Sequence, residues 1–364
     1  MYRFHDDLLL RVFSTHSTMT SFVLITGCDS GFGSFLAERL LTSHPHIGVI
    51  ACYHTKEGLA KGPAASDRCF KHLLDVTSGE SVEGLRGAVK TWIAGRKNAS
   101  LQAIVNNAGG LLVSGPIEWS PASLDEAQMN LNFTGTVRVT KAFLSDIREN
   151  RGRVINVSSI LGLVGSPFGA AYAASKFAVE GWTDGLRREM LPFGVRVSLI
   201  EPGFFSGTEF YKRYTAPVEE GWGRLDKTVQ SAYGEHYRDY VMKRLVKLYK
   251  ALGTSDPQLV VNCMEDAIIN PRPKHRYRVG LDCIVLARIL QWIPVQLADL
   301  VLTVADVVVA MDLSMWPRMP SKSLGSHWLA IVRFEIGGYA FPWVILTLLS
   351  ILVMYLGYLL IYIN

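Results

Sequence analysis

Short apolar runs alternate with longer amphipathic segments between residues 21 and 280. Such runs are typical of strands covered on both faces, and amphipathic segments are typical of the helices that cover them. Strands that alternate with helices predict an α/β fold, a doubly wound parallel sheet with helices on both faces. We expect strands at residues 22–26, 47–53, 69–76, 101–106, 153–157, 195–200 and 277–279, and helices at residues 32–41, 82–94, 124–147, 172–191 and 257–269.

The pattern changes outside this main domain, 21–280. Residues 1–20 hold only a short apolar patch interrupted by charges, which predicts a flexible lead and not a targeting segment. Within the domain, residues 204–252 are rich in aromatic and charged side chains and are expected to form a substrate lobe. Residues 281–340 predict an apolar, membrane-associated helical extension that lies on the bilayer surface or covers the substrate mouth. A second membrane span near residues 283–311 is the alternative.

The C-terminus is expected to anchor the chain in a membrane. Residues 341–363 contain no charged side chain and are long enough to cross a bilayer as a helix. Aromatic side chains suited to the membrane interfaces occur at Trp343, Tyr355, Tyr358 and Tyr362. We therefore predict a single transmembrane helix, with the lipid bilayer as a partner.

Composition and charge argue against nucleic-acid binding, a metal site and a disulfide framework. The net charge is only +5 and no basic stripe is interleaved with aromatics, so we expect no nucleic-acid partner. The five cysteines are scattered, without metal-ligand spacing or a disulfide framework. We therefore expect no metal site, and a reducing compartment for the main domain.

Tyr172 and Lys176 are the most informative candidates for catalysis. Their spacing stacks the two side chains on one face of a helix. A nearby ammonium group favours the charged form of a phenol, so we expect Lys176 to lower the pKa of Tyr172. Such a pair suits a general acid or base for an alcohol or carbonyl. A surface pair is the alternative when the spacing is taken alone.

Glycines follow the first predicted strand in the run Thr-Gly-Cys-Asp-Ser-Gly-Phe-Gly, residues 26–33. A turn of this kind brings the backbone close to a pyrophosphate at a helix N-terminus, so it predicts a Rossmann-type dinucleotide site. Other strands end in Asp75, whose alternative role is to cap the next helix, in Asn-Asn-Ala-Gly at 106–109, and in Ser158-Ser159. These strand ends meet at the carboxyl edge, where such sheets bind ligands.

In this order and spacing, the motifs resemble those of the short-chain dehydrogenases/reductases. The resemblance covers residues 22–279 and includes the glycine turn, Asn-Asn-Ala-Gly, Ser159, Tyr-x-x-x-Lys and Pro202-Gly203. The residues of the glycine turn, together with the segments Leu-Asp-Val-Thr and Glu-Pro-Gly-Phe-Phe, resemble more narrowly those of the retinol dehydrogenase and 17β-hydroxysteroid dehydrogenase branch. That branch also includes 3-hydroxybutyrate dehydrogenases.

The resemblance implies a role for each matching residue. Tyr172 donates or accepts the proton, Ser159 holds the substrate oxygen, and Asn132 supports a proton relay through water and Lys176. Asn130, two residues earlier, is the weaker match for Asn132. The implied cofactor-binding residues are Gly27, Ser30, Gly31, Phe32, Gly33, Tyr53, Asp75, Asn107, Ala108, Gly109, Tyr172, Lys176, Pro202 and Gly203.

The choice between NAD and NADP depends on the end of the second strand. An acid there usually binds the ribose hydroxyls of NAD. This chain instead has Tyr53, and the following His54 and Lys56 would suit the 2′-phosphate of NADP. Similar enzymes of the branch lack the acid and use NAD, so the resemblance favours NAD. The family often has a threonine shortly after Pro-Gly that contacts the cofactor amide. The corresponding residue here is Thr208, one position later than in the similar branch, and Ser206 is the alternative.

The implied activity is NAD(P)-dependent hydride transfer to or from a lipophilic alcohol or carbonyl, a retinoid or a steroid, by a membrane-anchored enzyme. The alternatives are a hydroxy-acid dehydrogenase of the 3-hydroxybutyrate type and a catalytically silent cofactor-binding scaffold. A tail anchor predicts a cytosolic catalytic domain on the endoplasmic reticulum, with the mitochondrial membrane as the alternative. The sequence leaves a homo-oligomer open.

Overall fold

The computed structural model describes residues 20–205, 215–252, 256–299, 301 and 302. Within these ranges, the strands form one parallel sheet in the order β3-β2-β1-β4-β5-β6-β7. Their bounds are β1 Thr20–Ile25, β2 Ile47–Tyr53, β3 Cys69–Leu73, β4 Ala99–Asn106, β5 Arg153–Val157, β6 Arg196–Pro202 and β7 Arg276–Val279. The doubly wound α/β sheet is therefore confirmed, and its strand order reverses between β1 and β4, the point where such folds bind ligands.

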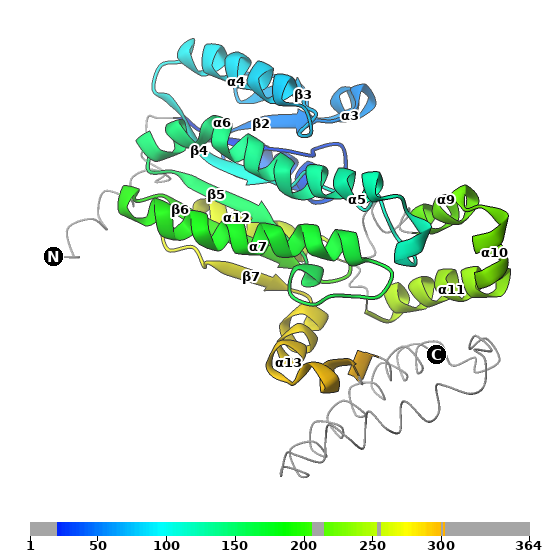
Figure 1. Cartoon of the computed structure of the whole chain (residues 1–364). Helices are drawn as coiled ribbons and strands as arrows, with labels where there is room; N and C mark the ends of the chain where they lie inside the picture. Colours follow the sequence, from blue (N-terminus) through cyan, green and yellow to red (C-terminus); the bar gives the residue numbers. More distant parts are fainter. Residues whose placement is uncertain (1–19, 206–214, 253–255, 300, 303–364) are drawn as a thin grey trace.

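Helices cover both faces of the sheet (Figure 1). Helices α2 (Gly31–Ser43) and α12 (Gln258–Ile269) pack on one face, where Leu36 and Met264 share a core with the strands. Helices α4 (Gly79–Ala94), α6 (Gly135–Glu149) and α7 (Ala170–Met190) cover the other face, where Val139 and Leu186 join a second core. Every residue of β2 is buried, as expected for a strand between two helical layers.

The predicted helix at residues 124–147 is interrupted. Helix α5 (Ala122–Met129) continues into a π-helical turn, Asn130–Thr134, before α6 begins. Turns of this kind are frequent at functional sites because they change the direction in which a side chain points. The sequence also did not predict the short helix α3 (Lys56–Lys61), and β3 ends earlier than expected, at Leu73.

The predicted substrate lobe is helical and lies beyond the carboxyl edge of the sheet, at one end of Figure 1. It contains α9 (Ala216–Arg224), α10 (Lys227–Tyr233) and α11 (Glu235–Leu252). Its aromatic side chains form a small core in which the Trp119 ring lies 5.0 Å from that of Trp222 and 5.6 Å from that of Tyr233. Part of the aromatic content of this segment therefore holds the lobe together.

Beyond β7 the chain forms a π-helical turn, Asp282–Leu286, and helix α13 (Ala287–Trp292). Cys283 and Ala287 pack there against Ile160 and Leu163, next to the end of β5. None of the described helices is both long and apolar enough to cross a membrane. The predicted anchor at 341–363, nearly all of the lead and most of the extension at 281–340 lie outside the described residues.

Candidate active site

The glycine turn between β1 and α2 is joined to the loop that follows β4. Gly27 and Gly31 have φ angles of +71° and +63°, a region that favours glycine. The Thr26 hydroxyl accepts hydrogen bonds from the N–H groups of Asn107 (3.0 Å) and Ala108 (2.9 Å). The Asn107 amide donates to the carbonyls of Thr26 and Gly27, both at 3.0 Å. The predicted pyrophosphate and adenosine segments thus form one rigid unit.

The N-terminus of α2 can receive an anion. Its N-cap residue, Ser30, is exposed and makes no capping hydrogen bond, and the first turn carries no acidic side chain. Free N–H groups and the helix dipole at such an end favour a phosphate group. A Cβ atom on Gly33 would lie 2.5 Å from the Gly27 carbonyl oxygen, so only glycine fits this packing. The residues present here fit a dinucleotide. Phe32, between Gly31 and Gly33, packs its ring against that of Phe205.

Ser159, Tyr172 and Lys176 meet at the end of β5. Ser159 makes a side-chain hydrogen bond with the Tyr172 phenol, and its Oγ also accepts from the Leu161 N–H at 3.1 Å. The Lys176 ammonium donates to the Val157 carbonyl at 3.0 Å and lies 5.7 Å from the centre of the Tyr172 ring. All three catalytic candidates are buried. The alternative that Tyr172 and Lys176 form only a surface pair is therefore wrong.

The expected lowering of the Tyr172 pKa is not found. Burial raises the pKa of Tyr172 to about 12, although the hydrogen bond with Ser159 acts in the opposite direction. Burial lowers the pKa of Lys176 to about 8, against the opposing effect of Glu180. Desolvation is thus the largest influence on the pKa of each group. The pKa of the phenol therefore lies far above neutral pH, and the pKa of the ammonium lies below its usual value.

Asn132 lies in the π turn and faces this cluster. Its amide donates to the Gly110 carbonyl (3.1 Å) and to the Ser175 hydroxyl (3.0 Å), and its Oδ1 accepts from the Gly110 N–H (2.9 Å). A Cβ atom on Gly109 would lie 3.0 Å from Asn132 Oδ1 and 3.5 Å from the Lys176 ammonium. The loop after β4, the π turn and α7 therefore converge at one point.

Two residues predicted to contact the cofactor, Tyr53 and Asp75, have surroundings that the sequence did not predict. The Tyr53 side chain is fully buried in the core, so its ring does not face the site. The predicted direct contact of this side chain with the cofactor is therefore wrong. Asp75 accepts from the N–H (2.8 Å) and hydroxyl (2.7 Å) of Thr77, and the Thr77 hydrogen bonds hold its pKa below the usual range. Helix α4 is capped by Ser78, so the alternative capping role of Asp75 is also wrong.

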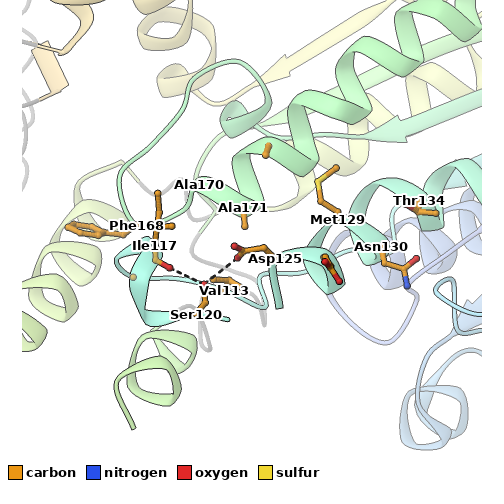
Figure 2. Close-up of a pocket in the computed structure, with 13 residues that line it drawn as sticks. Val113, Ile117, Ser120, Asp125, Met129, Asn130, Thr134, Phe168, Ala170 and Ala171 are labelled. Carbon is orange, nitrogen blue, oxygen red and sulfur yellow. Dashed lines mark hydrogen bonds between the residues drawn. The ribbon is translucent and has the colours of Figure 1, made fainter. Parts of the chain in front are cut away.

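A cavity of about 560 Å³ lies beside α7 (Figure 2). Ala170, Ala171 and Ala174 line it, and the helical repeat of 3.6 residues places them away from Tyr172 and Lys176. Asn130 also lines this cavity, whereas Asn132 faces the catalytic cluster. The structure therefore separates the two asparagines between which the sequence had left a choice.

Pro202 ends β6, and Gly203 follows it beside Asp282, a residue that the sequence did not single out. Asp282 Oδ2 accepts from the Phe204 N–H at 2.8 Å, and the Asp282 side chain is 2 % exposed. Burial raises the pKa of Asp282 to about 6, although hydrogen bonds from backbone N–H groups act in the opposite direction. Thr208 and Ser206, the candidates for the amide contact, lie outside the described residues.

We expect Asp282→Asn to be more stable than the parent protein at pH 8. A folded-state pKa above the unfolded value contributes stability that is complete at low pH and is lost as the pH rises through about 6. The folded parent protein loses on the order of 3 kcal/mol of unfolding free energy as Asp282 ionises. The uncharged amide of the Asp282→Asn variant does not ionise, so the variant avoids this loss. Urea unfolding of both proteins at pH 4.5 and pH 8 measures the difference. An equal difference at the two pH values would contradict the assigned titration.

Ser175 and Thr26 also belong to this site but were missed from the sequence. Ser175 is fully buried, donates to the Tyr172 carbonyl at 2.6 Å and accepts from Asn132. Its position three residues after Tyr172, on the same helix face, was a usable signal. Thr26 lies in the glycine run itself.

The chain matches the family model described as short chain dehydrogenase over residues 21–219. Retinol dehydrogenase 16 of Mus musculus is 37 % identical over 300 residues, which are 81 % of this chain and 92 % of that protein. The 17-beta-hydroxysteroid dehydrogenase type 6 of Bos taurus is 35 % identical, with 78 % and 87 % covered. A short-chain dehydrogenase of Streptomyces avermitilis has a solved structure with a TM-score of 0.57 and 25 % identity, covering 81 % of this chain and 98 % of that one.

The chain belongs to the short-chain dehydrogenase family. It is an NAD(P)-dependent oxidoreductase of alcohols and carbonyls, related to retinol and hydroxysteroid dehydrogenases. Its fold is also that of two Burkholderia dehydrogenases solved with different cofactors, one with NADP (TM-score 0.58) and one with NAD (TM-score 0.58).

Proposed function

We propose that this chain is a membrane-anchored dehydrogenase that interconverts a retinoid or steroid alcohol and its carbonyl, with NAD as the cofactor. The observation that carries the proposal is the buried hydrogen bond between Ser159 and Tyr172 beside Lys176, in a chain related to retinol and 17-beta-hydroxysteroid dehydrogenases. The names of these relatives support the substrate class, since both contain lipophilic alcohols.

In this proposal each side chain has a separate task. The bound nicotinamide supplies or accepts the hydride. Ser159 holds the substrate oxygen, and Tyr172 gives a proton to that oxygen or takes one from it. Lys176 would hold the nicotinamide ribose and, with Asn132, would pass the proton to solvent in alcohol oxidation or take one from solvent in carbonyl reduction. Gly109 keeps the space between Asn132 and Lys176 open, because a Cβ atom there would crowd both side chains.

The surface near α13 supports the membrane part of the proposal. Leu281, Trp292 and Val295 are 65 %, 86 % and 66 % exposed, which is unusual for large apolar side chains close together in the sequence. The same segment packs, through Cys283, against the residues that follow Ser159. A lipid-facing surface would therefore lie beside the substrate mouth. The uncharged stretch at 341–363 would supply the anchor.

The substrate is tested with membranes that contain the full chain. Retinol, androstanediol, estradiol and 3-hydroxybutyrate are offered with NAD or NADP, and reduced cofactor is measured. We expect turnover of a retinoid or steroid and none of 3-hydroxybutyrate. Turnover of 3-hydroxybutyrate alone would contradict the proposed substrate class.

We propose the endoplasmic reticulum as the location, with the catalytic domain in the cytosol and the mitochondrial membrane as the alternative. Asn98 is exposed in the acceptor sequence Asn-Ala-Ser, at the start of β4. The chain expressed in eukaryotic cells should therefore remain without a glycan at Asn98 while it fractionates with endoplasmic reticulum markers. A glycan removable by endoglycosidase would instead place the domain in the lumen.

A hydroxy-acid substrate remains the second candidate because the lobe contains a buried arginine. Arg244 in α11 is 4 % exposed, and its guanidinium lies 4.9 Å from the centre of the Phe168 ring. A small hydroxy acid requires a cation for its carboxylate, and Arg244 is a buried cation among the described residues of the lobe. Arg244→Met should abolish turnover of 3-hydroxybutyrate if that candidate is right, and should spare a retinoid or steroid.

A further inference from the structure

An acidic side chain reaches the end of β2, although β2 itself carries none there. The Asp29 carboxylate, from the glycine turn, accepts from the backbone N–H groups of His54 (2.7 Å) and Thr55 (2.8 Å). It also accepts from the Thr55 hydroxyl at 2.7 Å. The turn after β1 therefore delivers a carboxylate to the place where β2 ends.

The surrounding residues are arranged around this carboxylate. The Thr55 hydroxyl accepts from the Gly58 N–H at 2.9 Å and so caps α3, the helix that follows β2. A Cβ atom on Gly58 would lie 3.0 Å from the Cβ of Asp29 and closer still to its carboxylate. Glycine at this position therefore gives Asp29 its space. The interaction links the glycine turn, the end of β2 and the first turn of α3.

The carboxylate retains the capacity to bind a further donor. Two carboxylate oxygens offer about four acceptor positions. Oδ1 of Asp29 uses two with Thr55, and Oδ2 uses one with His54, which leaves one on Oδ2. The salt bridges among the described residues do not include Asp29, so no cation there neutralises it.

We propose that Asp29 is the residue that selects NAD over NADP, a role that rests on the proposed use of NAD. In a doubly wound fold the adenosine ribose meets the end of β2, where an acid accepts a hydrogen bond from the 2′-hydroxyl. The open position on Asp29 Oδ2 accepts that hydroxyl. A 2′-phosphate would instead meet a negative charge, which is the repulsive element that specificity requires.

Binding of NAD⁺ and NADP⁺ to the full chain in detergent, measured by isothermal titration calorimetry, tests this role without a substrate. Asp29→Asn should raise the affinity for NADP⁺ relative to NAD⁺ by roughly tenfold or more, because it removes the charge and keeps the size. Glu57→Gln in α3 removes an exposed carboxylate nearby and should leave the ratio unchanged. Thr55→Ala keeps the charge that disfavours NADP⁺ but removes the hydroxyl that positions the carboxylate. The affinity for NAD⁺ should therefore fall, while that for NADP⁺ should not rise as it does in Asp29→Asn.

The outcomes separate this proposal from the proposed use of NAD. A parent protein that prefers NADP⁺ would overturn both. A parent protein that prefers NAD⁺, with an Asp29→Asn variant that weakens both cofactors equally, would overturn the selective role of Asp29 alone. Thermal unfolding of the cofactor-free variants verifies that any change in ratio does not come from a damaged fold.

Discussion

Replacing Tyr172 with phenylalanine is expected to reduce turnover of every substrate by about 10²–10⁴-fold, the usual contribution of a positioned general acid or base. The ring keeps its place in α7, and only the phenol oxygen, with its hydrogen bond to Ser159, is lost. The variant should therefore fold and bind dinucleotide as the parent protein does. Steady-state rates in membranes, together with calorimetric cofactor binding, separate loss of proton transfer from loss of binding.

Tyr233→Phe is the matched control for this experiment. It removes a phenol oxygen of the same chemistry, which lies in the lobe and donates to Glu118 at 2.8 Å. Its rates should stay within about twofold of the parent protein, as expected for a substitution away from the chemistry. Equal rates in Tyr172→Phe and the parent protein would rule out the proton-transfer role. A parent protein that turns over no substrate would favour the scaffold alternative.

The strands and the catalytic cluster could be predicted from sequence because their signals are local or depend on order along the chain. β2 and β5 have the predicted bounds, since apolar runs between polar turns mark buried strands directly. Ser159 was paired with Tyr172 through the resemblance to the short-chain dehydrogenases/reductases, which depends on the order and spacing of the two residues along the chain. The π turn at Asn132 was not predictable in this way, since one inserted residue changes the helical period too little to show in the pattern.

The pKa values of the catalytic residues and the long-range contacts of Asp29 could not be predicted from the sequence. The spacing of Tyr172 and Lys176 indicated attraction between them, but the depth of burial determines the pKa of each, and burial depends on the whole fold. Asp29 was overlooked for a similar reason, because its partner Thr55 is 26 residues away. Pairing across such a distance follows from strand order and not from any local pattern.

A partly buried ion cluster beneath α7 was also not predicted from the sequence. Arg276 in β7 bonds both Glu180 and Glu201 and lies 3.0 Å from Asp184, while Arg278 bonds Glu201 at 2.9 Å. Burial raises the pKa of Glu180 to about 7, Glu201 adds to this effect, and Arg276 opposes it. The cluster joins the last strand to the helix that carries the catalytic pair.

Arg276→Met should lower the free energy of unfolding by about 3–5 kcal/mol, because it leaves Glu180 without its cation partner and Glu201 with Arg278 alone. The loss should grow between pH 5 and pH 8. A carboxyl group whose pKa is raised in the folded state costs stability as it ionises, and removal of Arg276 raises that pKa further. Urea unfolding of the full chain at both pH values measures the two effects.

The control variants distinguish charge from packing. Arg188→Met removes an exposed arginine 3.9 Å from Asp184 and should change stability by no more than about 0.5 kcal/mol. Adding Glu180→Gln to Arg276→Met should restore part of the loss, because it neutralises the carboxylate that the first substitution left unpaired. A loss that is independent of pH and not restored by Glu180→Gln would show that Arg276 acts through its packing, and the catalytic helix would then not depend on this charge balance.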